Sequence, residues 1–263
     1  MTSAMEPRKS SVPVKVSIIA ITAALYAVGK ALTGPIPFAY SVGEVLIAIF
    51  IPAFFVVVAD TLPAAIGAGI GTFIGDYFVR TTPAISLVAG VPSNFVAILL
   101  FGLFVKRYRS WSAFVAGTVA FVTLGNLIAA VNVVLYAALP TSWIPGFVVA
   151  WNITGIPSII IGVPALVRAV RPLFGRATIL TNLPDWSGIV GGRQLALSLV
   201  FPVLYTVLGV VVFAVQGLDL GLGSGGGTTG LVYFGIAAVV VLIFGPLSGA
   251  IGGAKQRASQ GAV

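Results

Sequence analysis

A series of eight long apolar runs, almost free of charged residues, constrains this chain more than any other feature of its sequence. Each run is long enough to cross a hydrocarbon layer of roughly 30 Å as an α-helix. Overall, 59% of the residues are hydrophobic and only 8% are charged, whereas about 25% are charged in soluble domains. We therefore expect an all-α, polytopic membrane helical bundle with spans near residues 16–33, 42–59, 62–79, 84–105, 112–139, 146–168, 194–216 and 230–252.

The basic residues indicate how this bundle is oriented. With the N-terminus in the cytoplasm, the cytoplasmic segments hold twelve of the fourteen Lys and Arg residues, and only Lys30 and Arg80 fall on the outer side. Positively charged loops resist translocation, so we expect both termini inside and a multi-pass protein of the cell (plasma) membrane. Topology then accounts for the formal net charge of +8, and we expect no nucleic-acid partner.

Polar stretches between the runs suggest how the chain is divided. The longest of them falls between the sixth and seventh predicted spans, so it separates six spans from a final pair. In chain order, we expect a cytoplasmic N-terminal segment (1–15), a six-helix substrate-binding membrane core (16–170), a cytoplasmic connector (171–193), an additional transmembrane hairpin (194–252) and a cytoplasmic tail (253–263).

The residue types present leave few tools for catalysis. The sequence contains no cysteine and no histidine, so we expect no metal site, no cofactor and no enzymatic activity. Two of the six carboxylates, Asp60 and Asp76, lie at opposite ends of the third predicted span. Their separation of about 24 Å, at ~1.5 Å per residue, is too large for one catalytic centre. A membrane scaffold or an intramembrane enzyme is therefore the least favoured function.

Small residues recur at helical spacing in two of the predicted spans. Such stripes let another helix backbone approach closely in a membrane. They could pack helices within this chain, or the alanine stripe could face a partner subunit, and the spacing alone does not decide between these interpretations. The stripes consist of Ala20, Ala24, Ala27 and Ala31 in the first span, and Gly67, Gly71 and Gly75 in the third.

Polar side chains within the spans converge on the outer half of the predicted bundle. Polar groups in lipid are costly unless they are paired, so such a cluster indicates a binding site. Hydrogen bonding between helices, or an aromatic belt at the headgroups in the case of Tyr136, is the alternative. The residues that we expect to bind substrate are Glu44, Asp76, Asn94, Asn132, Tyr136, Trp151 and Asn152.

The charge of the ligand stays open at this point. The carboxylates and Trp151 could hold a cationic ring, whereas Lys30 and Arg80 could recruit an anion. The chain contains no Walker motif for ATP hydrolysis. It also lacks a chain of acidic residues through both leaflets and clear inverted repeats, which are usual in secondary transporters. A stand-alone secondary transporter or channel is therefore the alternative to a binding subunit.

Three segments resemble the substrate-binding S-components of energy-coupling factor (ECF) uptake transporters. They are the first-span pattern of Ala20 and Ala24 within AITAALYAVGKALTG, the glycine-rich third span ending in GTFIGDYF, and the fourth-span stretch VPSNFVAILLFGLFVKR. The resemblance covers residues 16 to about 170. It implies a six-helix subunit that binds a vitamin or similar small organic micronutrient near the outer face.

The resemblance also implies partners. In that family, the first-span alanines contact a transmembrane T-component, which couples to a pair of cytoplasmic ATPases. Ala20 and Ala24 would be docking positions, and Ala27 continues their stripe. The predicted hairpin at 194–252 departs from the six-span pattern and puts the usual mode of docking in doubt. The absence of histidine argues against the nickel- and cobalt-binding relatives.

Overall fold

The computed structural model describes residues 11–34, 45–79, 83–141, 143–174 and 179–180, and in these ranges the chain forms helices and no strand. Within these ranges, five helices are long and apolar enough to cross a membrane: α1, α3, η2 with α4, α5, and α6 with η3. The elements are α1 (Val12–Thr33), η1 (Ile47–Ile49), α2 (Phe50–Val58), α3 (Thr61–Val79), η2 (Ser86–Gly90), α4 (Val91–Tyr108), α5 (Trp111–Tyr136), α6 (Trp143–Val170) and η3 (Arg171–Leu173).

Each of the first six apolar runs corresponds to a helical segment, but the second is shorter than expected. Together, η1 and α2 extend from Ile47 to Val58. At ~1.5 Å per residue this segment is about 18 Å long, whereas a full crossing needs roughly 30 Å. Residues 42–44 of that predicted span lie outside the described ranges, as do the two predicted spans at 194–216 and 230–252.

Local interactions determine where consecutive helices end and begin. Arg109 ends α4 in the left-handed conformation with φ of 45°, and its N–H bonds the carbonyl of Val105. Ser110 follows in an extended conformation and accepts a hydrogen bond from the N–H of Ala113, which caps α5. Because only these two residues connect the helices, α4 and α5 pack as antiparallel neighbours. Similarly, Ala59 and Asp60 connect α2 to α3, and the Lys106 ammonium donates to the Ala59 carbonyl.

The glycine stripe of α3 is the surface on which α1 packs. A Cβ atom on Gly67, Gly71 or Gly75 would lie 2.7 Å from an atom of Thr22, Ala23 or Lys30 respectively. The partner numbers rise together, so α1 and α3 run parallel, and only glycine permits this close approach. The stripe therefore packs helices within this chain, which was one of the two interpretations of the spacing.

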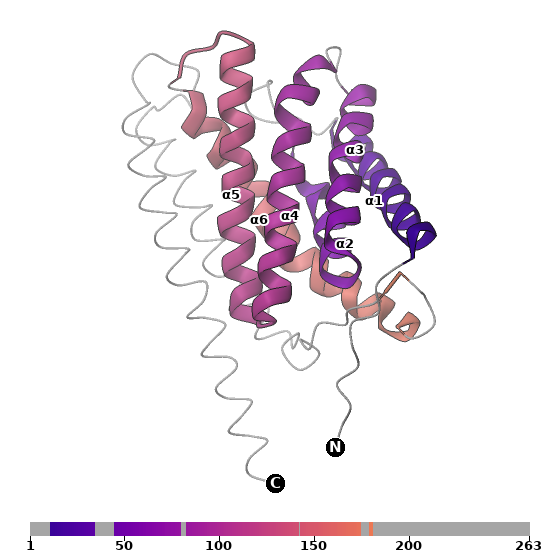
Figure 1. Ribbon diagram of the computed structural model, residues 1–263. Coiled ribbons are helices and arrows are strands. Elements are labelled where there is room, and N and C mark those ends of the chain that lie inside the picture. Colours follow the sequence, from indigo (N-terminus) through magenta and orange to yellow (C-terminus); the bar gives the residue numbers. More distant parts are fainter. Residues whose placement is uncertain (1–10, 35–44, 80–82, 142, 175–178, 181–263) are drawn as a thin grey trace.

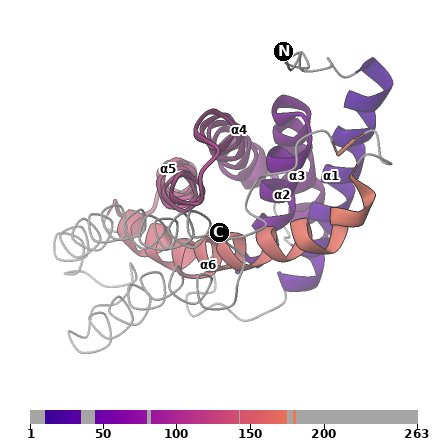
Figure 2. The same cartoon turned by 90° about the horizontal axis from the view of Figure 1, so that it is seen from below.

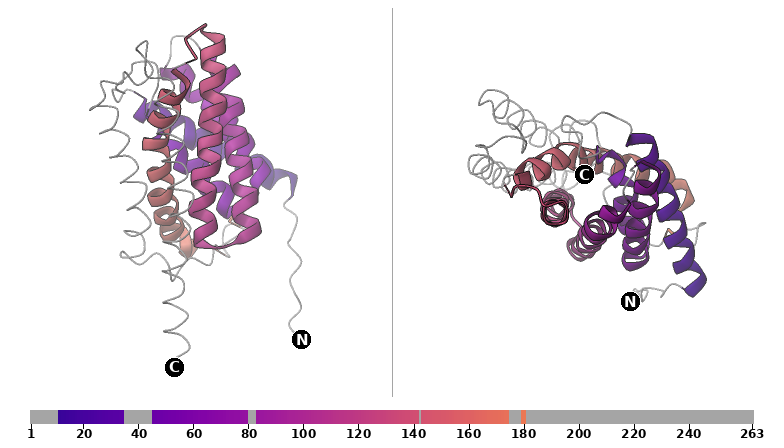
Figure 3. Two further views of the ribbon diagram at one scale, coloured as in Figure 1. Left: turned by 90° about the vertical axis from the view of Figure 1, so that its left-hand side faces the viewer. Right: turned by 90° about the horizontal axis from the view of Figure 1, so that it is seen from above.

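The helices are arranged with α1 at an edge of the bundle and α6 across it. Figure 1 shows α2 to α5 roughly upright, and α6 running obliquely behind them. Seen from below, α6 extends from α5 towards α2 and α1 (Figure 2), and it packs against both α5 and α2. Views from the side and from above place α1 at the margin, against α3 (Figure 3).

Apolar side chains fill the half of the bundle in which α4 ends and α5 begins. Phe101 and Phe114 meet edge to face with their ring centroids 5.7 Å apart, and Trp111 stacks on Phe114. Thr118 is fully buried in this half, but its hydroxyl bonds the carbonyl of Phe114 on its own helix. This half therefore has a sealed core, and the buried polar cluster lies towards the opposite end.

Candidate functional site

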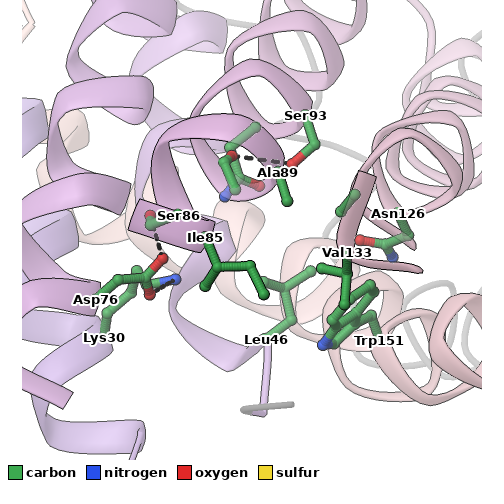
Figure 4. Close-up of a pocket in the computed structure, with 13 residues that line it drawn as sticks. Lys30, Leu46, Asp76, Ile85, Ser86, Ala89, Ser93, Asn126, Val133 and Trp151 are labelled. Atoms are coloured by element: carbon green, nitrogen blue, oxygen red, sulfur yellow. Dashed lines mark hydrogen bonds and ion pairs between the residues drawn. The ribbon is translucent and has the colours of Figure 1, made fainter. Parts of the chain in front are cut away.

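A cavity opens between the helices near the end of the bundle where α1 and α3 finish and α4 begins (Figure 4). Its volume is about 50 Å³, counted as the space open to the centres of water molecules. The lining residues are Lys30, Leu46, Asp76, Ile85, Ser86, Ala89, Gly90, Ser93, Asn94, Asn126, Ala129, Val133 and Trp151.

One wall of the cavity is a buried ion pair. The Lys30 ammonium of α1 lies 2.8 Å from Asp76 Oδ1 of α3, and the two residues are only 4% and 3% exposed. The hydroxyl of Ser86 donates to Asp76 Oδ2. A buried charge without a partner is strongly unfavourable. The ammonium and the carboxylate therefore stabilise each other in their charged forms. The ion pair ties α1 and α3 to the start of the fourth span.

This finding changes the sequence-based view of Lys30. The outer-side position expected for Lys30 and Arg80 stays a prediction; the structure adds that Lys30 is buried within α1 and faces α3. Arg80, four residues after Asp76 in the sequence, lies outside the described ranges. The partner that Asp76 has in the structure comes from a different helix. Sequence spacing within α3 could not have indicated it.

A π-helical turn, η2, shapes the wall beside the ion pair. Such turns are rare and are frequently found at functional sites. Here the turn places Ser86 against Asp76 and brings Gly90 close to α3. A Cβ atom on Gly90 would lie 2.9 Å from Thr72 Cγ2 and 3.2 Å from Asp76 Oδ2. Glycine at this position therefore lets the fourth span approach the carboxylate.

Amide side chains supply further polar groups. The Asn94 amide donates to the hydroxyl of Thr72, which itself donates to the carbonyl of Ala68. Asn126 of α5 donates to Asn152 Oδ1 at 2.8 Å. These bonds orient two amides that border the cavity, because the position of each nitrogen is determined by its acceptor.

Asn152 supports the cavity from behind. Its own amide nitrogen donates to the Thr123 hydroxyl at 3.0 Å, so it links α6 to α5 at two points. Its side chain is buried, and it is not among the residues that line the cavity. Asn152 was expected either to bind substrate or to form hydrogen bonds between helices, and the structure shows the hydrogen bonds.

The remaining wall is aromatic and aliphatic. Trp151 stacks on Phe147 with an interplanar angle of 18°, so its indole plane has a defined orientation. Leu46 approaches from the start of η1, and its backbone N–H bonds the hydroxyl of Thr154 on α6. In Figure 4, Leu46 and Ile85 lie between the ion pair on one side and Asn126 and Trp151 on the other.

The structure brings together some of the residues expected to bind substrate. Asp76, Asn94 and Trp151 all line the cavity. Asn132 is partly exposed and Tyr136 is 54% exposed, and neither lines it. Glu44 lies outside the described ranges. The predicted set therefore mixes cavity residues with residues on other faces of the same helices.

The predicted docking residues are also divided. Ala20 and Ala24 are exposed on α1, as a partner-facing stripe requires. Ala27 is buried, and a Cβ atom on Gly75 of α3 would lie 3.3 Å from its Cα. Ala27 therefore belongs to the contact between α1 and α3 and is covered by this chain. The exposed part of the stripe ends before it.

The residues expected to bind substrate left out four polar members of the cavity, Lys30, Ser86, Ser93 and Asn126, although Lys30 had been considered as a group that could recruit an anion. Lys30 carried a signal, since a lysine inside an apolar run implies a nearby counter-charge. Asn126 was visible near the middle of its span. The two serines gave no signal, because a serine can satisfy its own helix backbone, as Ser93 does at Gly90.

The arrangement is suited to binding a small molecule. It offers hydrogen-bonding groups, one paired charge and an aromatic plane around a space enclosed by helices. Comparisons with models of protein families, with curated proteins and with solved structures gave no match to this chain. The cavity itself must therefore support any functional proposal.

Proposed function

We propose that this protein is the membrane-embedded substrate-binding subunit of an ECF-type uptake transporter for a vitamin or similar small organic micronutrient. The observation that carries the proposal is the polar cavity enclosed by apolar helices, with the Lys30–Asp76 ion pair in its wall. Replacing a buried ion pair by packed apolar residues is often neutral or stabilising. A role in binding gives a reason for retaining charged and amide groups at this depth.

The predicted topology gives the cavity a direction. With the N-terminus inside, α1 and α3 both end at the outer surface, so the cavity opens towards the outside of the cell membrane. The apolar half around Phe101 and Phe114 then seals the cytoplasmic side. An apolar core that closes the cytoplasmic side suits a subunit that binds its ligand from outside and releases it only after a partner has docked.

Two features support the proposed partners: the chain contains no Walker motif, and α1 exposes small side chains. In the proposed ECF-type transporter, a cytoplasmic ATPase pair drives uptake, coupled through a transmembrane T-component. Ala20 and Ala24 give α1 an exposed strip of small side chains at the edge of the bundle. Small residues allow close backbone contact between helices, so this strip is the proposed docking surface for the T-component.

The proposal is tested by ligand screening of the full-length chain purified in detergent or nanodiscs. Its thermal unfolding is measured with a panel of vitamins and nucleobases, and any co-purified small molecule is identified by mass spectrometry. We expect one compound to raise the melting temperature in a saturable way. If no compound does so and none co-purifies, the proposal is wrong.

Reconstitution separates this function from the alternative, a stand-alone secondary transporter or channel. Liposomes that contain the chain alone, with the ligand found in the screen, should show binding without accumulation or downhill flux. Ligand flux from the chain alone, without any ATPase, would establish the alternative. The same liposomes without protein are the control for leakage.

A further inference from the structure

The uncharged polar side chains that line the cavity share one property: each donates a hydrogen bond to the protein itself. In the described part of the chain these residues are Ser86, Ser93, Asn94 and Asn126. The hydroxyl of Ser86 donates to Asp76 Oδ2, and the hydroxyl of Ser93 donates to the carbonyl of Gly90. A hydroxyl group has only one proton. Both serines therefore have no donor left for a ligand, whereas their oxygens can still accept.

The orientation of the Asn94 amide follows from its neighbour on α3. The hydroxyl of Thr72 donates its proton to the carbonyl of Ala68, one turn earlier in the same helix. Its oxygen can then only accept a hydrogen bond, so the amide atom 2.9 Å away is the nitrogen of Asn94. The two ends of a carboxamide diverge, and Asn94 lines the cavity whereas Thr72 does not. Asn94 therefore presents its oxygen to the cavity.

The Asn126 amide has the same orientation on the opposite wall. Its nitrogen donates to Asn152 Oδ1 at 2.8 Å, and the nitrogen of Asn152 donates in turn to the hydroxyl of Thr123. Neither Asn152 nor Thr123 is among the lining residues, so this chain of bonds runs behind the wall. Asn126 thus also presents its oxygen to the cavity. Figure 4 shows Ser86, Ser93 and Asn126 on different sides of the enclosed space.

A wall of oxygen acceptors selects ligands by their hydrogen-bond donors. An N–H or O–H group of a ligand supplies the proton that each oxygen lacks. A ligand oxygen in the same place brings two acceptors together and leaves both unpaired in a buried site, which is strongly unfavourable. Trp151 also lines the cavity, and its indole N–H provides a donor for an acceptor elsewhere on the ligand.

We propose that Asn94 and Asn126 recognise the ligand through its hydrogen-bond donors, and that Thr72 and Asn152 are positioning residues that hold the two amides in this orientation. The ligand then carries at least two N–H or O–H groups, as ureas, amides, amines and hydroxylated compounds do. Donors on neutral and on charged groups meet this requirement equally. This inference rests on the proposed function, in which the chain binds a small nutrient, and specifies how that nutrient is recognised.

The first experiment compares three uncharged probes of nearly the same shape. They are 2-imidazolidinone, 2-oxazolidinone and ethylene carbonate, which share a five-membered ring and a carbonyl group but place two, one and no N–H groups beside it. Affinity is measured for the full-length chain in nanodiscs from its thermal unfolding at increasing probe concentration. We expect 2-imidazolidinone to bind about tenfold more tightly than ethylene carbonate, which is about 1.4 kcal/mol, with 2-oxazolidinone between them. A ratio below about threefold, or the reverse order, would overturn the inference.

The second experiment releases the Asn94 amide without removing it. Thr72→Val keeps the shape of the side chain and removes the hydroxyl that accepts from Asn94, so the amide can turn either end to the cavity. The preference for 2-imidazolidinone over ethylene carbonate should then fall by about threefold or more. Thr72→Ser retains the hydroxyl and should retain the preference. Wild-type selectivity in a folded Thr72→Val variant would show that Thr72 does not position Asn94 for binding.

A third variant keeps the inference testable if Thr72→Val does not fold. Asn126→Leu removes one acceptor outright, so the affinity for 2-imidazolidinone should fall more than that for ethylene carbonate. Equal losses for the two probes would contradict recognition through donors. Asn132→Ala lies on the same helix but outside the cavity, and as the control it should leave both affinities unchanged.

The outcomes for the two proposals can be told apart. If the vitamin and nucleobase screen identifies a ligand without N–H or O–H groups, or a ligand while none of the three probes binds, the inference fails and the proposed function stands. If neither the screen nor the probes reveal binding, both fail. A ligand with at least two donors, together with the expected order of the probes, supports both.

Discussion

Substituting single glycines of α3 tests how α1 is held in place. Gly71 and Gly69 lie two positions apart on the same helix but face different neighbours. A Cβ atom on Gly71 would lie 2.7 Å from the backbone oxygen of Ala23 and 3.1 Å from its Cα. The nearest atoms to a Cβ on Gly69 belong to Val91 and Phe95, at 3.5 and 3.7 Å, which is ordinary contact. Gly71→Ala therefore forces two backbones apart, whereas Gly69→Ala fills available space.

The expected magnitude follows from the difference between these two variants. Both gain the same intrinsic helix preference of alanine over glycine, about 1 kcal/mol, so this gain cancels in the comparison. Overpacking costs typically about 1–3 kcal/mol, and only Gly71→Ala incurs it. At about 2–4 °C for each kcal/mol in chains of comparable size, the melting temperature of Gly71→Ala should lie roughly 2–12 °C below that of Gly69→Ala.

The assay is thermal unfolding of the two variants in the same detergent, followed by tryptophan fluorescence and by circular dichroism. A further readout is ligand binding, because displacement of α1 moves Lys30 away from Asp76. Gly71→Ala should bind more weakly than Gly69→Ala. Equal melting temperatures and equal affinities for the two variants would refute the close packing of α1 on α3 described above.

Three further predictions concern the ion pair, the amides and the exposed face of α1. Lys30→Met should lower the free energy of unfolding by about 3–5 kcal/mol because it removes the ammonium that pairs with the buried Asp76 carboxylate, and the double variant with Asp76→Leu should recover much of that loss in chemical unfolding. Asn126→Ala should lower the free energy of unfolding by about 0.6–1.7 kcal/mol, which spans the average to the maximum measured for hydrogen bonds between membrane helices. Asn132→Ala should lower it by less in the same assay. Ala24→Trp should abolish uptake and co-purification with a T-component while ligand affinity stays within about twofold, roughly 0.4 kcal/mol. Normal uptake by this variant would show that the exposed alanine strip of α1 is not the docking surface for the T-component.

Local hydropathy was enough to locate helices α1, α3, α4, α5 and α6. The predicted span at 62–79 is α3 (Thr61–Val79), and that at 146–168 lies within α6 (Trp143–Val170). Such agreement is expected, because a run of apolar residues must hydrogen-bond its own backbone in lipid whatever its neighbours are. The second predicted span, 42–59, contains the shorter apolar helix Ile47–Val58, and residues 42–44 lie outside the described ranges.

The sequence by itself determined that this chain is an apolar helical bundle with a few polar groups at depth, since composition and run length are local properties. Only the tertiary structure decided which of those groups meet. Asn126 lines the cavity and Asn132 does not, although both lie on α5. Six residues at 3.6 per turn place them on different faces, and only packing determines which face turns inward. For the same reason, Lys30 meets Asp76 across 46 residues of chain, a pairing that no local pattern encodes.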